Sequence, residues 1–189
     1  MPAKTTRDHI IETSDQLFYM QGFDHTSFAH LANAAHISRG NFYYHFKTKD
    51  EILDAVIMVR REKTKTMLKQ WENDNADPEK RILDFIHILI RNRSKILNYG
   101  CPVGTLNAEL IKLNHNSKND AKKIFSLFRA WLKKQFSLLG HQKNADALAM
   151  HILSQSQGVA TLANAFDDRN FIDQEVNRMT EWLKSLKEA

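Results

Sequence analysis

The stretch TSFAHLANAAHISRGNFYYHFKTK, residues 26–49, decides the fold of this chain. It predicts a short helix capped by Thr26 or Ser27, a turn over residues 34–38, and a second short helix capped by Ser38, because threonine and serine are favoured N-cap residues. Apolar residues in the first helix recur at the three- and four-residue spacing of one buried face. We therefore expect two short helices joined by a tight turn.

The second short helix and the loop after it carry side chains suited to DNA. When a helix-turn-helix enters the major groove, the first residues of its second helix lie nearest the bases. Arg39 can pair with guanine or hold a phosphate, Asn41 can pair with adenine, and Gly40 allows close approach of the backbone. Phe42 and Phe46 lie four residues apart and are expected to face inward. The expected DNA-contacting residues are Ser38, Arg39, Gly40, Asn41, Tyr43, Tyr44, His45, Lys47 and Lys49.

The rest of the chain predicts an all-α protein with about nine helices. Besides the two short helices, helical periodicity or capping signals predict helices over residues 6–21, 50–71, 78–97, 103–113, 120–139, 144–166 and 173–187. Asp50 is the expected cap of the long helix that follows the basic loop. We expect an N-terminal three-helix head, residues 1–50, and a larger helical body, residues 51–189.

Composition and the lack of certain motifs argue against several classes of protein, namely disulfide-linked, membrane-spanning and secreted proteins and enzymes. With 6 glycines and 3 prolines among 189 residues, the chain favours helix, and its one cysteine excludes an intrachain disulfide. No apolar run reaches the roughly 18 residues of a membrane span, and Asp8 and Glu12 interrupt any signal peptide. We expect a cytoplasmic protein without a membrane partner. No metal spacing, phosphate loop or nucleophile motif occurs, so we expect no enzyme, cofactor or metal site.

The segment from Thr26 through ISRGNFYYHFKTKDEIL resembles the DNA-binding head of the tetracycline-repressor (TetR) family. The resemblance covers roughly residues 8–54, and it departs from the family at His36, where a turn glycine is usual. Histidine can enter the left-handed region at a modest cost. The resemblance implies a homodimeric repressor that binds a palindromic double-stranded DNA operator and is released by a small-molecule inducer. The DNA-contacting positions that it implies are Thr26, Arg39, Asn41, Tyr43, His45 and Lys49.

In the resembled family the last two helices pair with their copies in a four-helix interface. Two heads about 34–36 Å apart would read a palindrome, which also favours a dimer. The alternative is that the apolar faces of both helices are buried within one subunit. The candidate interface residues are Ile152, Val159, Leu162, Phe166 and Trp182.

The body is expected to hold a pocket for an apolar or aromatic molecule, because aromatic side chains are mixed there with a few polar ones. Each of these residues could equally be ordinary core. The candidate lining residues are Trp71, Phe85, His87, Leu106, Leu110, Phe128, Trp131 and Gln155.

Cys101 supports an alternative function. It lies in the sequence GCPVG, residues 100–104, where Pro102 is expected at the first position of a helix and Cys101 at its N-cap. The helix dipole and free amides there would stabilise a thiolate and raise its reactivity. The protein would then be a thiol-based repressor that senses oxidants or electrophiles. The competing interpretation is a small structural residue. A module that binds nucleic acid without specificity is a further alternative, but residues 1–50 carry five basic and five acidic residues, and such binding needs many cations.

Overall fold

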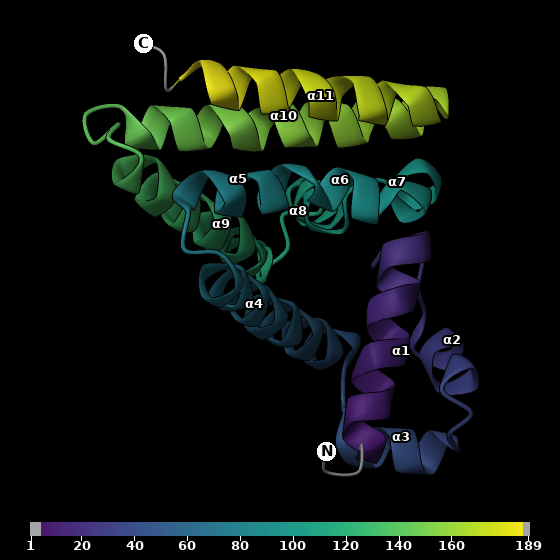
Figure 1. The fold of residues 1–189 in the computed structure, drawn as a ribbon. Helices are drawn as coiled ribbons and strands as arrows, with labels where there is room; N and C mark the ends of the chain where they lie inside the picture. The colour runs from purple at the N-terminus through teal and green to yellow at the C-terminus, as the bar shows by residue number, and fades with distance from the viewer. Residues whose placement is uncertain (1–4, 187–189) are drawn as a thin grey trace. The chain divides into compact units, whose positions relative to one another are not determined.

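The computed structural model describes residues 5–186, and every regular element assigned within that range is a helix (Figure 1). The chain forms two compact units. The N-terminal unit contains the described residues up to 63 together with residues 105–123. The C-terminal unit contains residues 64–104 and the described residues from 124 onward. The all-α prediction is confirmed.

The N-terminal unit begins with α1 (Thr6–Gln21), whose predicted bounds are those observed. Thr5 and Asp8 form a reciprocal capping box at its start, and Gly22 ends it at a φ of 86°. Next come α2 (Phe28–Ala34), capped by Ser27, and α3 (Arg39–His45), capped by Ser38. The helix-turn-helix of the sequence prediction is therefore present.

The turn between α2 and α3 passes through the left-handed region at His36, with a φ of 52°. This is the position at which the resembled family usually has glycine. The amide of Ile37 donates to the carbonyl of Ala32 at 3.2 Å and closes the turn. Histidine therefore replaces glycine without loss of the turn geometry.

The long helix α4 (Lys49–Asp74) follows the basic loop. The prediction that Asp50 caps this helix is wrong. The hydroxyl of Thr48 accepts the amide of Glu51 at 3.1 Å, and Asp50 lies in the first turn. There its carboxylate lies near the positive end of the helix dipole without capping it.

The C-terminal unit starts within α4 and continues with α5 (Pro78–Ile86), α6 (Ile88–Arg91) and α7 (Arg93–Tyr99). A single helix over residues 78–97 was expected, but short breaks at His87 and Asn92 divide it. Hydrogen bonds still reach the first break from both sides, because His87 N–H donates to Leu83 O at 2.8 Å and Arg91 N–H donates to His87 O at 3.0 Å. If α5, α6 and α7 are counted as one interrupted helix, the described range contains nine helices, which is the number expected.

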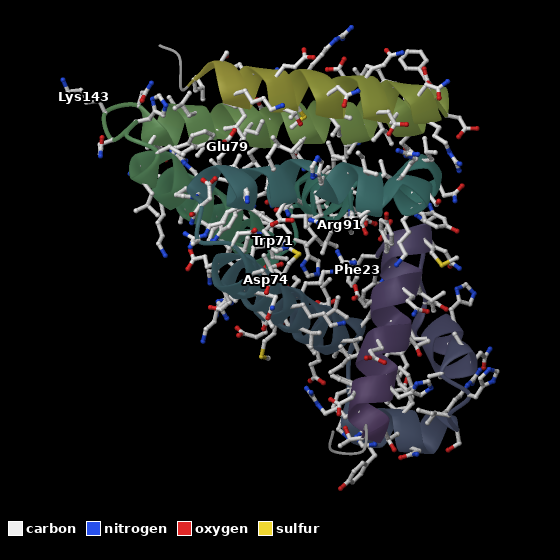
Figure 2. All side chains as sticks on the ribbon, in the orientation of Figure 1. Phe23, Trp71, Asp74, Glu79, Arg91 and Lys143 are labelled. Atoms are coloured by element: carbon white, nitrogen blue, oxygen red, sulfur yellow. The ribbon has the colours of Figure 1, made fainter. Side chains whose placement is uncertain are left out.

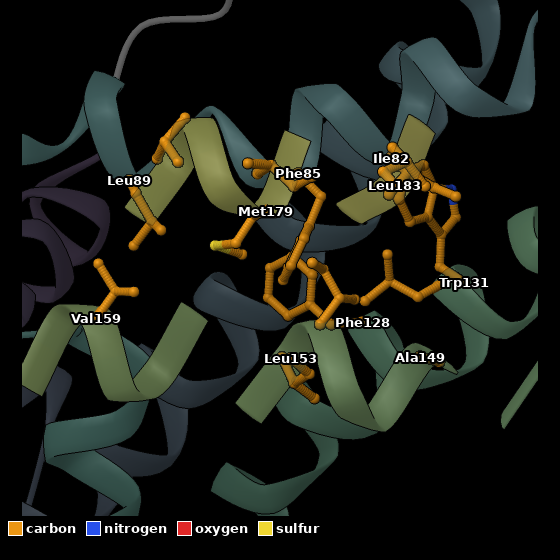
Figure 3. Packing of buried hydrophobic residues seen from close by; sticks show 14 of the residues in the cluster. Ile82, Phe85, Leu89, Phe128, Trp131, Ala149, Leu153, Val159, Met179 and Leu183 are labelled. Carbon is orange, nitrogen blue, oxygen red and sulfur yellow. The ribbon is translucent and has the colours of Figure 1, made fainter. Parts of the chain in front are cut away.

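The remaining helices are α8 (Pro102–Lys112), α9 (Lys118–Leu138), α10 (Ala145–Phe166) and α11 (Arg169–Ser185). Within the C-terminal unit, α10 and α11 lie side by side (Figure 1). The core of this unit is built from aliphatic and aromatic side chains, including Phe85, Phe128, Leu153 and Met179 (Figure 3). In the described part of the chain, no helix is long and apolar enough to cross a membrane.

Candidate functional site

The outer surface of α3 is polar and open to solvent. Arg39, Gly40 and Asn41 in its first turn are exposed, as is Lys47 after its end. The hydroxyl of Ser38 accepts the amide of Asn41 at 3.4 Å and caps the helix. The residues expected nearest to DNA bases therefore lie together at one accessible helix end.

The inner surface of α3 anchors it to the N-terminal unit. Phe42 is completely buried, and the ring of Phe28 in α2 meets it edge-on at a centroid distance of 4.7 Å. Phe28 also stacks on Tyr43, again at 4.7 Å. Phe46 is buried just beyond the helix. The expected inward direction of Phe42 and Phe46 is confirmed, and the helix is fixed by aromatic contacts.

The two tyrosines of α3 differ in their surroundings. Tyr43 is 49% exposed because one of its faces covers Phe28, whereas Tyr44 is 77% exposed. The ring of Tyr44 meets the His45 ring edge-on at 5.2 Å. An aromatic residue exposed to this extent contributes little to the core.

The side chains of Thr26 and Lys49 make hydrogen bonds to backbone carbonyls within the N-terminal unit. Thr26 is fully buried, and its hydroxyl donates to the carbonyl of Gly22 at 2.6 Å. The ammonium group of Lys49 donates to the carbonyl of Phe23 at 2.9 Å and lies 4.1 Å from the centroid of that ring. Both residues hold the turn between α1 and α2, so the structure separates them from the exposed residues of α3.

A cavity opens in the C-terminal unit, with about 530 Å³ of empty space when its open mouth is included. Its wall is mostly apolar, and the rings of Phe85 and Phe128 lie 5.6 Å apart in it. Polar groups are few, and they come from Asn92, Ser156 and Gln157. The full lining is Phe85, Ile88, Leu89, Asn92, Ile96, Cys101, Pro102, Val103, Phe125, Phe128, Leu153, Ser156, Gln157 and Ala160.

Two of the eight expected lining residues, Phe85 and Phe128, line this cavity. Trp71 and Trp131 instead pack against each other in the core, with ring centroids 5.6 Å apart. The guanidinium of Arg91 lies 5.4 Å from the centroid of the Trp71 ring. Figure 2 labels Trp71 and Arg91. Leu106 and Leu110 belong to the core of the N-terminal unit. The structure places His87 half-buried at the break before α6 and Gln155 on the exposed side of α10.

The sequence prediction missed the polar side of the cavity. Ser156, Gln157 and Ala160 lie within about one turn of α10. Ser156 and Ala160 are four residues apart and therefore share one face of the helix, where their small side chains leave space. That spacing is the signal that could have indicated this side of the cavity. Asn92 has a weaker signal. Its side chain donates to the carbonyl of Ile88 at 3.0 Å, which is a local contact that sequence patterns seldom reveal.

Cys101 lies in the cavity wall immediately before α8. The amide of Gly104 donates to its sulfur at 3.5 Å, which is the contact of an N-cap residue with the third residue of the helix. A Cβ atom at Gly104 would come within 2.5 Å of the Gln157 side-chain oxygen. Glycine at this position therefore lets Gln157 approach the start of α8.

The candidate interface residues divide into buried and exposed groups. Ile152 and Val159 are buried within the subunit, and Trp182 is partly buried with its ring 4.7 Å from that of His151. Leu162 is 46% exposed and Phe166 is 75% exposed. Of these five candidates, Leu162 and Phe166 are the two that offer large apolar surfaces to another molecule.

A cluster of charged and polar side chains in the C-terminal unit surrounds Glu72 near the end of α4. The ammonium group of Lys134 donates to both carboxylate oxygens, at 2.8 and 3.0 Å, and the amide of Gln135 donates at 3.1 Å. The hydrogen bond from Lys134, its charge and the charge of Arg81 lower the pKa of Glu72, against the opposing effect of burial. The cluster ties α4 to α9. Across residues 5–186, no group of three potential ligand side chains is placed to hold a metal ion.

Comparison with known proteins agrees with the geometry of the N-terminal unit. The sequence profile of "Bacterial regulatory proteins, tetR family" matches residues 10–56. A TetR transcriptional regulator from Legionella pneumophila has a crystal structure with a TM-score of 0.84 and 26% identity, over 96% of this chain and 98% of that one. The chain carries the helix-turn-helix of the TetR family in its N-terminal unit. It is a helix-turn-helix transcriptional regulator that binds DNA.

Two curated relatives extend the similarity over most of the chain. An uncharacterized HTH-type transcriptional regulator in the lacX 3' region of Lactococcus lactis subsp. lactis is 28% identical over 177 residues, 90% of this chain and 89% of that protein. The HTH-type transcriptional repressor DhaR of a Mycobacterium species is 22% identical over 92% of this chain and 90% of that protein. Both are named as transcriptional regulators, and neither name describes an enzyme.

Proposed function

We propose that this TetR-family protein is a homodimeric repressor that a small-molecule inducer releases from a palindromic operator. The observation that supports this most strongly is the construction of α3. Arg39, Gly40 and Asn41 are exposed at its start, while Phe42 is fully buried and holds the helix in place. A rigid helix with polar side chains at its exposed N-terminal end suits base contact in the major groove.

In the proposed complex Arg39 and Asn41 read base edges, and the surrounding polar groups position the helix on the phosphates. Tyr43, Tyr44, His45 and Lys47 can donate to phosphate oxygens. Ser38 keeps the start of α3 ordered as its cap. The family resemblance also implies Thr26 and Lys49 as DNA-contacting positions. Their contacts inside the N-terminal unit support a second role for both residues, which is to hold the turn before α2.

The proposed inducer occupies the cavity of the C-terminal unit. Its apolar wall favours an apolar or aromatic body, and Asn92, Ser156 and Gln157 favour one hydrogen-bonding group at its edge. Ala160, which is buried in the wall, provides a test. Ala160→Leu should abolish inducer binding by filling the space, while operator affinity changes less than about threefold.

Dimerisation through α10 and α11 is supported by Leu162 and Phe166, which are exposed at the C-terminal end of α10. In the proposed mechanism, the inducer shifts α4, which begins just after the helix-turn-helix and runs on to Asp74. That shift changes the spacing of the two recognition helices and lowers operator affinity. Linkage requires that operator weakens inducer binding by the same factor.

The deciding experiment is a fluorescence-anisotropy titration of purified protein with DNA that flanks its own gene, at about 150 mM salt because phosphate contacts make affinity salt-dependent. Wild-type protein should prefer one fragment over scrambled DNA by about a thousandfold or more. Arg39→Ala and Tyr43→Ala should each lose most of that preference. Lys143→Ala, which removes an exposed cation from the loop before α10, is the matched control and should bind as wild type does. Equal binding of all sequences would refute a sequence-specific regulator.

A second candidate function is favoured by the position of Cys101. Its sulfur lies in the cavity wall and accepts the amide of Gly104, so an electrophile in the cavity would meet the thiol beside a helix start. The inducer would then be an electrophile that adds to Cys101. Such a compound should lower operator affinity of the wild type and leave Cys101→Ser unaffected. Equal responses of both proteins would exclude this mechanism.

A further inference from the structure

The turn between α1 and α2 is held by a carboxylate from a distant part of the sequence. Glu109 of α8 accepts the amide of Phe23 at 3.0 Å through one oxygen and the amide of Asp24 at 2.9 Å through the other. All these residues belong to the N-terminal unit. Hydrogen bonds to a charged acceptor are stronger than those between neutral groups, so this pair of contacts fixes the turn firmly.

The turn is shaped to admit this carboxylate. Gly22 has a φ of 86°, which favours glycine, and a Cβ atom there would lie 2.9 Å from one Glu109 oxygen. The absence of a side chain at residue 22 therefore leaves the space that the carboxylate uses. Gly22 serves both the backbone conformation and the approach of Glu109.

Lys49 completes the attachment through the carbonyls of the same two residues. Its ammonium group lies 2.9 Å from the Phe23 oxygen and 3.4 Å from the Asp24 oxygen. Thus α8 holds the amides of the turn and α4 holds its carbonyls. The turn leads through Thr26 to Ser27, the cap of α2, and α2 is followed by α3. Whatever displaces the turn also displaces the start of the helix-turn-helix.

The same helix that carries Glu109 begins in the wall of the cavity. Pro102 and Val103, the first two residues of α8, line the cavity in the C-terminal unit. Glu109 follows about two turns later, which corresponds to roughly 10 Å along the axis. An α-helix of this length transmits a displacement of its first turn to its last turns, because each turn is hydrogen-bonded to the next.

We propose that Glu109 is a positioning residue through which α8 couples occupancy of the cavity to the α1–α2 turn and hence to the recognition helix. This rests on the proposed function and deepens it, because it names a route of regulation besides α4. When α8 moves, the Glu109 carboxylate pulls or releases the amides of Phe23 and Asp24. The turn then loses the geometry that α2 and α3 require for DNA binding.

Because the chain has one cysteine, a thiol reagent can place a known group in the cavity. N-phenylmaleimide is the probe: the Cys101 thiol adds across its double bond, the thiol proton ends on the neighbouring carbon, and no group leaves. Mass spectrometry verifies one adduct per chain, and Cys101→Ser treated in the same way is the unlabelled control. This probe replaces an unidentified inducer with a defined occupant.

Hydrogen–deuterium exchange of the turn tests the coupling without DNA. In the wild type, labelling should speed exchange of the Phe23 and Asp24 amides by about tenfold or more, as expected for loss of such hydrogen bonds. In Glu109→Ala this exchange should already be fast and should not respond to the label. Glu109→Gln, which keeps an acceptor oxygen and the side-chain shape, should be intermediate. Lys112→Ala, an exposed change on the same helix, should behave as the wild type.

The second readout is operator affinity with and without the label. Labelling should weaken operator binding by about tenfold or more in the wild type and by less than about twofold in Glu109→Ala. If the label released operator without changing exchange at the turn, the cavity would act on DNA binding by another route and the proposal would be wrong. The proposal would also be wrong if the label weakened operator binding of Glu109→Ala as much as that of the wild type. If no operator is bound but the turn still responds to the label, the proposed function fails and the positioning role of Glu109 stands.

Discussion

His36 adopts a backbone conformation that costs a residue with a side chain more than it costs glycine. Its φ of 52° lies in the left-handed region. The penalty there is about 1–2 kcal/mol for most residues and smaller for histidine, and glycine avoids it at the expense of greater freedom in the unfolded chain. We expect His36→Gly to raise the free energy of unfolding by up to about 1 kcal/mol, or about 2–4 °C in Tm.

The same substitution inside a helix gives the control for His36. His30 is exposed within α2, where its amide is bonded to the Ser27 hydroxyl. His30→Gly should lower the free energy of unfolding by about 0.5–1 kcal/mol because glycine destabilises helices. Urea titrations of both variants measure the two effects. Changes of the same sign would show that the conformation of His36 is not under strain.

Glu72 should make the stability of the protein dependent on pH in acid. Its pKa in the folded state lies below the ordinary value of 4.5, chiefly because of the hydrogen bond from Lys134. A carboxyl group with a lowered folded pKa stabilises fully above its unfolded pKa and loses that contribution as the pH falls through the folded pKa. Glu72→Gln should therefore be less stable than the wild type above the ordinary pKa of 4.5, and the difference should close as the pH falls below that value and through the lowered folded pKa.

Urea unfolding between about pH 3 and 7 measures this difference. Glu181→Gln on α11 removes an exposed carboxylate and is the matched control, which should run parallel to the wild type throughout. A constant gap between Glu72→Gln and the wild type at every pH would show that the Lys134 contact contributes nothing through the charge of Glu72.

Sequence patterns located residues well where the cause was local. Ser38 was expected as a cap from its own chemistry, Ser27 was one of two candidate caps beside Thr26, and the inward direction of Phe42 followed from helical spacing. The burial of Thr26 and the contacts of Glu109 did not follow from any pattern. The Glu109 contacts join residues 85 and 86 positions apart, and only the folded chain brings them together.

At the scale of the element, α3 should depend on its aromatic anchor. Phe42 is fully buried and meets Phe28 edge-on. Phe42→Ala should lower the free energy of unfolding of the N-terminal unit by about 3–5 kcal/mol, because it leaves a cavity in the core. Hydrogen–deuterium exchange of α2 and α3 localises the effect.

The matched control on the same helix is Arg39→Ala. Arg39 is exposed, so its loss should change the free energy of unfolding by less than about 0.5 kcal/mol. A small effect of Phe42→Ala, comparable with that of Arg39→Ala, would contradict the anchoring role of the buried face.

Helix boundaries were predictable where a strong signal marks them. Gly22 ends α1, and Pro78 begins α5 after its cap Asp77. The breaks at His87 and Asn92 carry neither glycine nor proline, so helical periodicity ran through them. At the second break the backbone amide and the side chain of Asn92 both donate to the carbonyl of Ile88, at 3.0 Å each, and the sequence pattern does not reveal this shared contact.

At the scale of the whole molecule, the proposed dimer should depend on the exposed end of α10. Leu162 and Phe166 are exposed in the subunit, whereas Ile152 and Val159 are buried in it. The double variant Leu162→Asp with Phe166→Asp should weaken dimerisation by about a hundredfold or more, because buried apolar anchors dominate interface energy. Analytical ultracentrifugation over a range of protein concentrations measures the change.

The control for the dimer is Ile111→Asp, which changes an apolar residue that is 65% exposed on α8. It should leave the association constant unchanged. A wild-type protein that remains monomeric at about 100 μM would contradict the proposed assembly, since even weak specific interfaces associate near that concentration.

The all-α fold was predictable from composition and periodicity, but the cavity was not. Phe85 and Phe128 were expected to line it, and they do. Leu106 and Leu110 have the same apolar character but belong to the other compact unit. Periodicity identifies which residues are apolar and which face of a helix they share. It does not identify the core that this face joins, because that depends on long-range packing.

The construction of α3 bears on how regulators of this kind diverge. Its buried face is aromatic and its exposed first turn consists of three neighbouring residues, Arg39, Gly40 and Asn41. Substitutions at those three positions leave the scaffold untouched, so they need no compensating change elsewhere in the chain. After a gene duplication, a few such substitutions would give two proteins that share one architecture and each ignore the other's DNA.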